Sequence, residues 1–526
     1  MFGNSRLKGI FLLGVVYLFS VSSCSGTAAP MKEILISPDT VSVINNPMTG
    51  WVMYLGRNWD ETFWEKQGYD NMQTSDGTVV RVSDYASTAY IRTSWSSMEP
   101  RDGEFFWKDP DNRMSRLLKS CTDRGLRLAF RIVVDGRDQG PNTPEFVYRA
   151  GAEYYLQDER FPERKTPFPQ DPVFRKYYER FIKAFAAEFN DPEKTAFIDG
   201  YGLGKWGEGH NVAYEPGNAV TARTAALKED TMKWITELYS SAFTKVPIAI
   251  NYHRHIGHPV SEGRNAEPES EDLLEMAIDN GYCLRSDAIG MNNQDWGYNN
   301  WDRNFVRKWT YKVPVIIEGG WIVGQHSWKD DPAGYNSPFD VRKGEWDTAM
   351  EEKANMMDLR AGQETLSWFN DAFDLVTGFI REGGYRLYPD RILLPTEVSA
   401  GEKVTVTHRW NNLGCGYCPN NLKQWNHKYK VAFALINSEG KIVETHVDRN
   451  SEPADWIKGT PVSYDFKFRI GQLPSGSYKW IVGIADTSKD NVAGISLAIE
   501  GLEVSDGWVV LSDLIINNSS LKNGLA

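Results

Sequence analysis

The chain has 526 residues, of which 41% are hydrophobic and 24% charged. This composition fits a soluble globular protein and excludes a disordered chain or one with many membrane spans. The net charge of −12 and the pI near 5.3 argue against a nucleic-acid partner. Aromatic residues reach 13% and include 19 Trp. They can fill a large core, and they are also the side chains on which the apolar faces of sugar rings stack.

The first 23 residues predict a signal peptide. Arg6 and Lys8 precede an apolar run over residues 10–21, which is shorter than the roughly 20 residues of a membrane-spanning helix. The run ends in Val21-Ser22-Ser23-Cys24, which resembles the lipobox of bacterial lipoproteins, where this Cys is lipidated. The resemblance implies a lipid-anchored protein of the cell envelope, and the lack of an acidic run after Cys24 favours the periplasmic face. An ordinary signal peptide cleaved near Ala28 or Ala29 is the alternative.

Residues 46–382 alternate short apolar runs with amphipathic helical segments, after an N-terminal linker at 24–45. Eight such runs and their helices predict an α/β TIM barrel, (β/α)8. A doubly wound open sheet is the alternative, but no G-x-G-x-x-G follows the first run. The runs expected to form strands are 51–55, 88–93, 126–134, 197–203, 246–251, 283–290, 313–317 and 364–368.

Residues 385–526 predict an all-β, immunoglobulin-like sandwich, because helical periodicity stops and short alternating runs follow. These runs are 403–410, 429–436, 462–470, 477–485 and 508–516. Only Gly383-Gly384 joins the two domains, and two residues reach too short a distance for a flexible tether. We expect the sandwich to pack rigidly against the side of the barrel, with Trp425 and Trp456 exposed. Cys415-Gly-Tyr-Cys418 is interpreted as a local disulfide.

Two glutamates stand where strands of the predicted barrel end. The fourth strand exits through Lys205-Trp-Gly-Glu208-Gly-His210, and the seventh runs directly into Glu318. Active sites of TIM barrels lie at these carboxyl ends. A charge placed directly after five apolar residues has a desolvation cost that a function would explain. Glu208 and Glu318 are therefore the candidate catalytic residues.

The pair resembles the signature of the clan A, or 4/7, retaining glycoside hydrolases. Arg92, near the end of the second strand, matches the arginine beside the nucleophile in that clan. The segment from Trp95 to Gly103, followed by Phe105 and Phe106, is similar to β-galactosidase-like members. Trp368 matches the aromatic floor of the sugar site. Residues 46–51 and the exit containing Glu208 also resemble barrel-plus-sandwich lipoproteins of Bacteroidetes. One departure is Gly207, where the clan usually has Asn.

The resemblance implies a glycosidase acting on a plant, microbial or host oligosaccharide or polysaccharide. Glu318 would be the nucleophile and Glu208 the acid/base of a double displacement, which needs carboxyls about 5–5.5 Å apart. Arg92 would keep Glu318 ionised, and Trp206 and Trp321 would raise the pKa of Glu208.

Other residues near the strand exits are expected to bind substrate, and no cofactor or metal is expected. A metal-dependent hydrolase using histidines such as His253 and His255 is one alternative. A non-catalytic glycan-binding lipoprotein is the other, because Gly207 departs from the clan. The substrate-binding candidates are Arg92, Trp206, His210, Asn251, His253, Asn292, Trp321 and Trp368.

Overall fold

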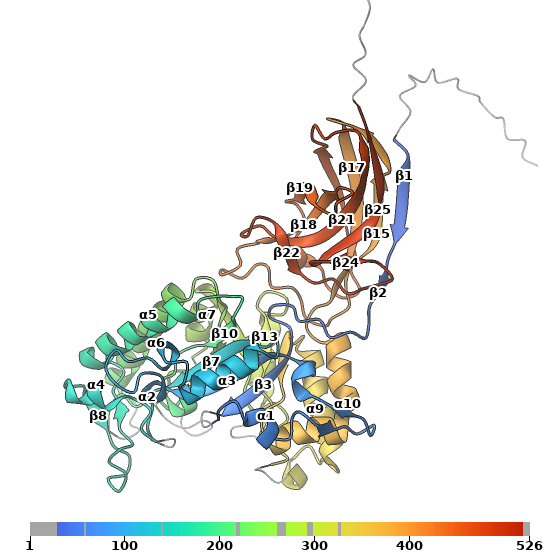
Figure 1. Cartoon of the computed structure of the whole chain (residues 1–526). Coiled ribbons are helices and arrows are strands. Elements are labelled where there is room, and N and C mark those ends of the chain that lie inside the picture. The colour runs from blue at the N-terminus through green and yellow to red at the C-terminus, as the bar shows by residue number, and fades with distance from the viewer. Residues whose placement is uncertain are drawn as a thin grey trace, which may run out of the picture.

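The computed structural model describes residues 29–56, 59–137, 140–216, 221–259, 270–291, 298–324 and 328–518. Within these ranges the chain forms a closed barrel surrounded by helices and, at one end of it, a sandwich of antiparallel sheets (Figure 1). The expected signal peptide and Cys24 lie outside the described residues. No helix of the described part has the length and apolarity needed to cross a membrane.

The barrel has eight parallel strands that neighbour one another in chain order and close between the last and the first. The strands are β3 (Gly50–Gly56), β6 (Ala86–Ser94), β7 (Arg127–Val133), β10 (Thr195–Asp199), β11 (Ile248–Asn251), β12 (Tyr282–Arg285), β13 (Val315–Ile317) and β14 (Met356–Asp358). The helices between and after them are α1 (Phe63–Lys66), α2 (Trp95–Met98), α3 (Arg113–Thr122), α4 (Glu145–Arg149), α5 (Pro172–Phe189), α6 (Ala222–Ala242), α7 (Glu271–Asp279), α8 (Asn300–Lys308), α9 (Pro338–Glu351) and α10 (Gln363–Glu382). This confirms the predicted (β/α)8 TIM barrel.

Helix α5 shows why the local sequence forms these elements. The Asp171 carboxylate accepts a hydrogen bond from the backbone N–H of Phe174 at 2.8 Å, and Pro172 occupies the first turn. Phe174, Phe181 and Phe185 recur at helical spacing and are fully buried against the barrel.

The prediction of the eighth strand is wrong. Residues 364–368 belong to helix α10, and the strand is β14 (Met356–Asp358). Three residues, of which two are apolar, give too weak a pattern to mark a strand. Trp368 therefore does not end a strand, and it packs on Trp51 with ring centroids 4.9 Å apart.

Two sheets form the sandwich, which confirms the predicted β domain. One contains β1 (Met31–Leu35), β15 (Leu387–Pro395), β17 (Lys403–Asn412) and β20 (Val462–Arg469). The other contains β16 (Glu397–Ser399), β25 (Trp508–Asn517), β21 (Gly476–Asp486), β18 (Tyr429–Ile436) and β19 (Ile442–Asp448), with β22 (Val492–Ile495) and β24 (Val504–Ser505) at its side.

The expected linker at 24–45 contributes a strand to the sandwich. Strand β1 pairs antiparallel with β15 from Met31 opposite Pro395 to Leu35 opposite Arg391. Figure 1 shows this blue strand along the edge of the orange and red sheets. The described part of the chain thus passes from the sandwich into the barrel and returns to complete the sandwich.

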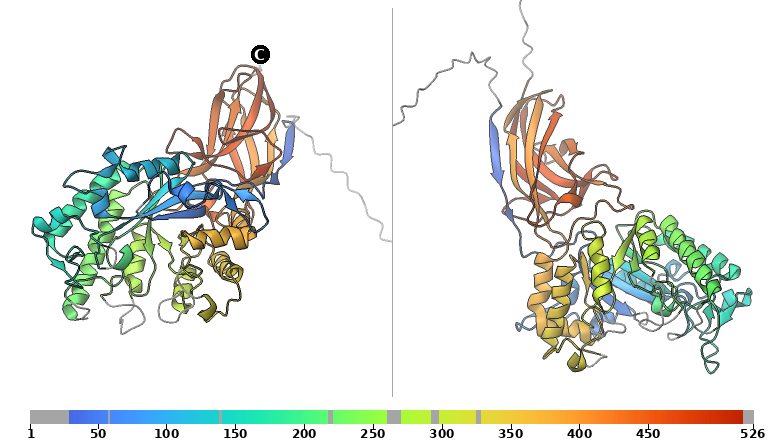
Figure 2. Two further views of the ribbon diagram at one scale, coloured as in Figure 1. Left: turned by 60° about the horizontal axis from the view of Figure 1, so that its bottom comes forward. Right: turned by 180° about the vertical axis from the view of Figure 1, so that it is seen from behind.

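The sandwich covers the end of the barrel at which the strands begin, and not its side (Figure 2). Interior barrel residues, among them Ala249 and Ile316, share one buried cluster with sandwich residues such as Trp410 and Val431. Backbone contacts seal the junction: Cys415 N donates to Glu382 O at 2.7 Å and Gly416 N to Gly384 O at 2.7 Å. That the joint is rigid, as the short connection suggests, stays a prediction.

Side chains at this junction correct two expectations. Trp425 and Trp456 are 3% and 0% exposed, so neither offers a surface for a sugar. Cys415 and Cys418 are both buried free thiols and form no disulfide. The Cys415 thiol lies 3.8 Å from Ala354 O, just before β14, where it packs the loop against the barrel.

Removing the sandwich should uncover this apolar end. We expect a chain truncated after Arg381 to be insoluble, or to melt more than about 10 °C below the full-length protein. Thermal unfolding followed by circular dichroism makes the comparison. A truncated barrel that melts at the parent temperature would show that the two domains fold independently.

Candidate functional site

The interior of the barrel has an apolar layer near the sandwich and a charged layer near the carboxyl ends of the strands. On β11, Ala249 belongs to the interior cluster while Ile248 and Ile250 face the helices, so Asn251 also points inward. The same alternation places a polar residue inward near the carboxyl end of seven strands. These residues are Arg92, Arg131, Asp199, Asn251, Arg285, Glu318 and Asp358.

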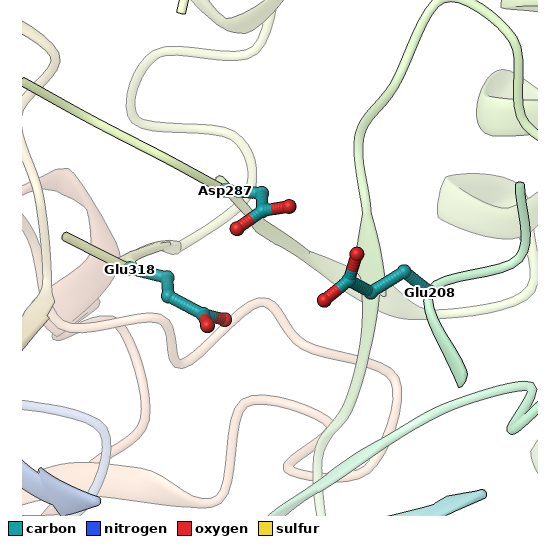
Figure 3. Close-up of side chains that lie close together, drawn as sticks. All are labelled: Glu208, Asp287 and Glu318. Atoms are coloured by element: carbon teal, nitrogen blue, oxygen red, sulfur yellow. The ribbon is translucent and has the colours of Figure 1, made fainter. Parts of the chain in front are cut away.

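Glu208 and Glu318 meet in this layer together with a third carboxylate, Asp287. One oxygen from each lies within 4.8 Å of the other two. Figure 3 shows the three carboxylates converging from separate strand exits. Glu208 follows a short helical turn, η3 (Lys205–Gly207), and Glu318 comes directly after β13. Glu318 is 0% exposed and Glu208 4%.

The exit loop of β10 needs glycine to place Glu208. Gly204 has φ of +71°, and a Cβ there would lie 2.2 Å from His210 O. Gly207 has φ of +76°, and its Cβ would meet the Arg131 side chain at 3.4 Å. The Asn expected at position 207 from the resemblance would be strained, because of the positive φ and because Val133 Cγ2, at 3.3 Å from the Cβ position, and Arg131 lie close.

Glu208 is held in its charged form. Its carboxylate lies 2.7 Å from Arg131 Nη1 and 3.1 Å from His210 Nε2. Burial alone would raise the pKa of Glu208, but Arg131, His210 and Arg92 outweigh it and lower the pKa below its usual value. The expectation that Trp206 and Trp321 raise this pKa is wrong. The Trp206 ring lies 5.8 Å from the His210 ring.

Glu318 forms ion pairs with two arginines that the sequence did not single out. Arg285 Nη1 contacts one of its oxygens and Arg360 Nη1 the other. Arg131 Nη2 lies 3.7 Å away. Within the described residues Arg92 forms no ion pair with Glu318, and its guanidinium interacts electrostatically with Tyr54 and Glu208.

Two buried aspartates complete the charged layer. Asp199 accepts hydrogen bonds from the Tyr90 hydroxyl and from Arg131 Nε, both at 2.7 Å. Asp358 accepts the backbone N–H of Gly319 at 3.3 Å. Burial raises the pKa of Asp358 to about 7, against the opposing effect of Arg285. Asp199 and Arg131 each interrupt an apolar run that forms a strand. A charged residue at such a position could have identified both as functional candidates from the sequence.

Histidines line the neighbouring loops. The His210 and His253 rings stack with centroids 5.0 Å apart, and His255 and His258 continue the row at 5.7 and 5.8 Å. Asn251 is 3% exposed, and neither atom of its side-chain amide has a hydrogen-bond partner within the described residues. The amide is therefore available to a ligand.

The other substrate-binding candidates have different outcomes. Trp321 is partly exposed, and its ring lies 4.5 Å from the Arg360 guanidinium carbon. Trp368 is 1% exposed and lies between α10 and the outer face of β3, so it does not line the site. Asn292 lies outside the described residues.

The charge pattern does not suit a metal ion. Within the described ranges, the ligand atoms of His, Cys, Asp and Glu come together in threes only at Glu208, Asp287 and Glu318. Both oxygens of Glu318 already contact arginines, and those of Glu208 contact Arg131 and His210. A divalent cation would have to displace these groups and lie among guanidinium charges.

Several solved glycoside hydrolase structures are similar to the chain. Endo-glycoceramidase II from Rhodococcus sp., solved with a five-membered iminocyclitol, matches with 11% identity and a TM-score of 0.38, covering 80% of this chain and 98% of that one. A GH30 endoxylanase from Clostridium papyrosolvens C71 matches with 9% identity and a TM-score of 0.37, covering 85% and 100%. Xylanase B from Clostridium stercorarium F9 matches with 12% identity and a TM-score of 0.32, covering 60% and 86%. No protein-family model and no curated protein matches.

Asp358 should make the stability of the barrel depend on pH. Its pKa near 7 in the folded state exceeds the value of about 3.9 in an unfolded chain. Protonated Asp358 therefore contributes its full share to the free energy of unfolding below about pH 4. This share is lost as pH rises through 7, by up to about 1.4 kcal/mol per pH unit. Urea unfolding from pH 5 to 8 should show the wild type losing stability relative to Asp358→Asn as pH rises. A difference that stays constant would contradict the assignment.

Proposed function

We propose that the protein is a glycoside hydrolase that works by double displacement with retention of configuration. The observation that carries the proposal is the meeting of Glu208 and Glu318, from the exits of β10 and β13, with oxygens within 4.8 Å. This spacing suits a nucleophile and an acid/base, whose carboxyls lie about 5–5.5 Å apart, better than an inverting pair at about 6.5–9.5 Å.

Glu318 is assigned as the nucleophile. Arg285 and Arg360 contact its two oxygens and favour the carboxylate over the acid. It would attack the anomeric carbon and form a covalent glycosyl-enzyme, while Glu208 protonates the departing oxygen. Glu208 would then remove a proton from the water that releases the sugar.

The proton for the first step needs a source, because Arg131 and His210 lower the pKa of Glu208. His210 Nε2 lies 3.1 Å from Glu208 Oε2, close enough to pass a proton directly. The active form is one in which Glu208 carries this proton. A sugar that excludes water from the site would weaken the solvation of the charged carboxylate and so favour the protonated form of Glu208.

Polar groups around the carboxylates would bind the sugar hydroxyls. The buried Asn251 amide can both donate and accept, and it lacks a protein partner within the described residues. Arg92, Trp206, His253 and Trp321 are partly exposed at other positions near the strand exits. The signal sequence adds the proposal that Cys24 is lipidated and anchors the enzyme in the cell envelope, with the periplasmic face favoured.

A glycan-binding protein without catalysis is the second candidate. The ion pairs on both oxygens of Glu318 and the lowered pKa of Glu208 favour it. In that case the polar layer would hold a sugar without cleaving it.

Replacing either glutamate separates these functions. We expect Glu318→Gln and Glu208→Gln to lower kcat by at least about 10²-fold on a cleaved glycan. Glu237→Gln, an exposed position on α6, is the matched control and should retain full activity. Full activity of Glu318→Gln would remove the nucleophile assignment.

The stereochemistry of the product tests the mechanism independently. Hydrolysis of aryl glycosides and polysaccharides, followed by proton NMR before mutarotation, should give the anomer of the substrate first. Initial release of the opposite anomer would show an inverting reaction and require a different carboxylate pair.

A further inference from the structure

A second cluster of buried charges lies outside the barrel, between α9 and α10. Arg342, Glu345 and Glu364 are each 0% exposed. Arg342 Nη1 donates to Glu345 Oε2 at 2.6 Å, and Arg342 Nη2 contacts Glu364 Oε2. Such a group far from water is costly unless its charges are balanced.

This cluster holds the chain segment that follows Glu318. The Glu364 carboxylate accepts the backbone N–H of Gly324 at 2.7 Å and that of Val323 at 3.3 Å. Glu345 lies against the start of the same segment, since a Cβ on Gly319 would be 2.8 Å from Glu345 Oε1. Both carboxyl groups therefore touch residues 318–324, one near each end.

The charges of the cluster balance only when one carboxyl is protonated. One guanidinium faces two carboxyl groups, and Asp358 of β14 adds a third acidic group nearby. Glu364 accepts from Arg342 and from two backbone amides, whereas Glu345 Oε1 has no hydrogen-bond partner within the described residues. The proton therefore belongs on Glu345, in accord with burial raising its pKa to about 8.

We propose that Arg342, Glu345 and Glu364 are positioning residues for Glu318, and that they hold residues 318–324 in place only while Glu345 is protonated. When Glu345 ionises, an unbalanced charge appears against Gly319, next to the glutamate. The expected effect on turnover rests on the proposed function. The expected effect on residues 318–324 does not.

Amide hydrogen exchange of residues 318–324, measured by mass spectrometry, tests the structural part. Exchange is compared at each pH with Glu345→Gln, so that the intrinsic pH dependence of exchange cancels. The matched control is Asp347→Asn, which removes an exposed carboxylate of the same helix that pairs with Lys343. We expect roughly tenfold faster exchange above pH 8 in the wild type and in the control, but not in Glu345→Gln.

A ratio of wild-type to Glu345→Gln exchange that stays constant from pH 7 to 9 would overturn the proposal. Glu364→Gln checks the other contact and should accelerate exchange of this segment at every pH. Unchanged exchange in that variant would also count against the cluster.

Turnover tests the consequence. The wild type should lose about tenfold in kcat as pH rises from 7 to 9, with KM changing less, and Glu345→Gln should not show this loss. An equal loss in both proteins would refute the link to catalysis. If no glycan is hydrolysed, the proposed function fails, while the exchange experiment still decides whether the cluster holds the segment.

Discussion

The structure depends on charges that are buried inside the barrel and must neutralise one another. Arg131 is central to this constraint, because it contacts Asp199 and Glu208 at 2.7 Å and lies 3.7 Å from Glu318. Removing one partner from such a network leaves an uncompensated charge, typically at a cost of about 3–5 kcal/mol. The candidate site is therefore part of the framework of the barrel. Strands β7, β10 and β13 are held in relative position by a network that includes the two glutamates proposed to react.

The apolar layer beneath these charges explains the second domain. Interior residues of the barrel belong to the same buried cluster as the core of the sandwich, so water is kept away from the lower side of the charged layer. Strand β1 and strands β15–β25 lie on either side of the barrel in sequence, which ties both ends of the barrel sequence to the sandwich. In the proposed function, the substrate would approach the carboxylates from the opposite end, where the strands end.

Much of this architecture could be predicted from periodicity, and most of the charged network could not. Seven barrel strands and five sandwich strands have apolar runs long enough to recognise, and the placement of Glu208 and Glu318 follows from them. Strand β14 has only three residues, too few for its sequence to predict a strand. The sequence therefore also gives no sign that Asp358 and Arg360 lie at a strand end. Which arginine pairs with which glutamate depends on inward alternation around the closed barrel. It also depends on which strands are neighbours: β13 pairs with β12 and β14, so Arg285 of β12 and Arg360, just after β14, contact Glu318. Burial of Trp425 and Trp456 likewise depends on domain packing that no local pattern encodes.

Gly319 links the two buried charge clusters. Its N–H donates to Asp358 inside the barrel at 3.3 Å, and Glu345 lies close to it on the helix side. Burial raises the pKa of Asp358 to about 7 and that of Glu345 to about 8. As pH rises through this range, Asp358 and Glu345 both become negatively charged beside Gly319. Like charges in a medium of low dielectric repel strongly. The guanidiniums of Arg131, Arg285 and Arg360, which lie around Glu318, must then balance these additional negative charges. The positive and negative charges around Glu318 are therefore best balanced below neutral pH. There Asp358 and Glu345 are protonated, and Arg285 and Arg360 pair with Glu318 alone.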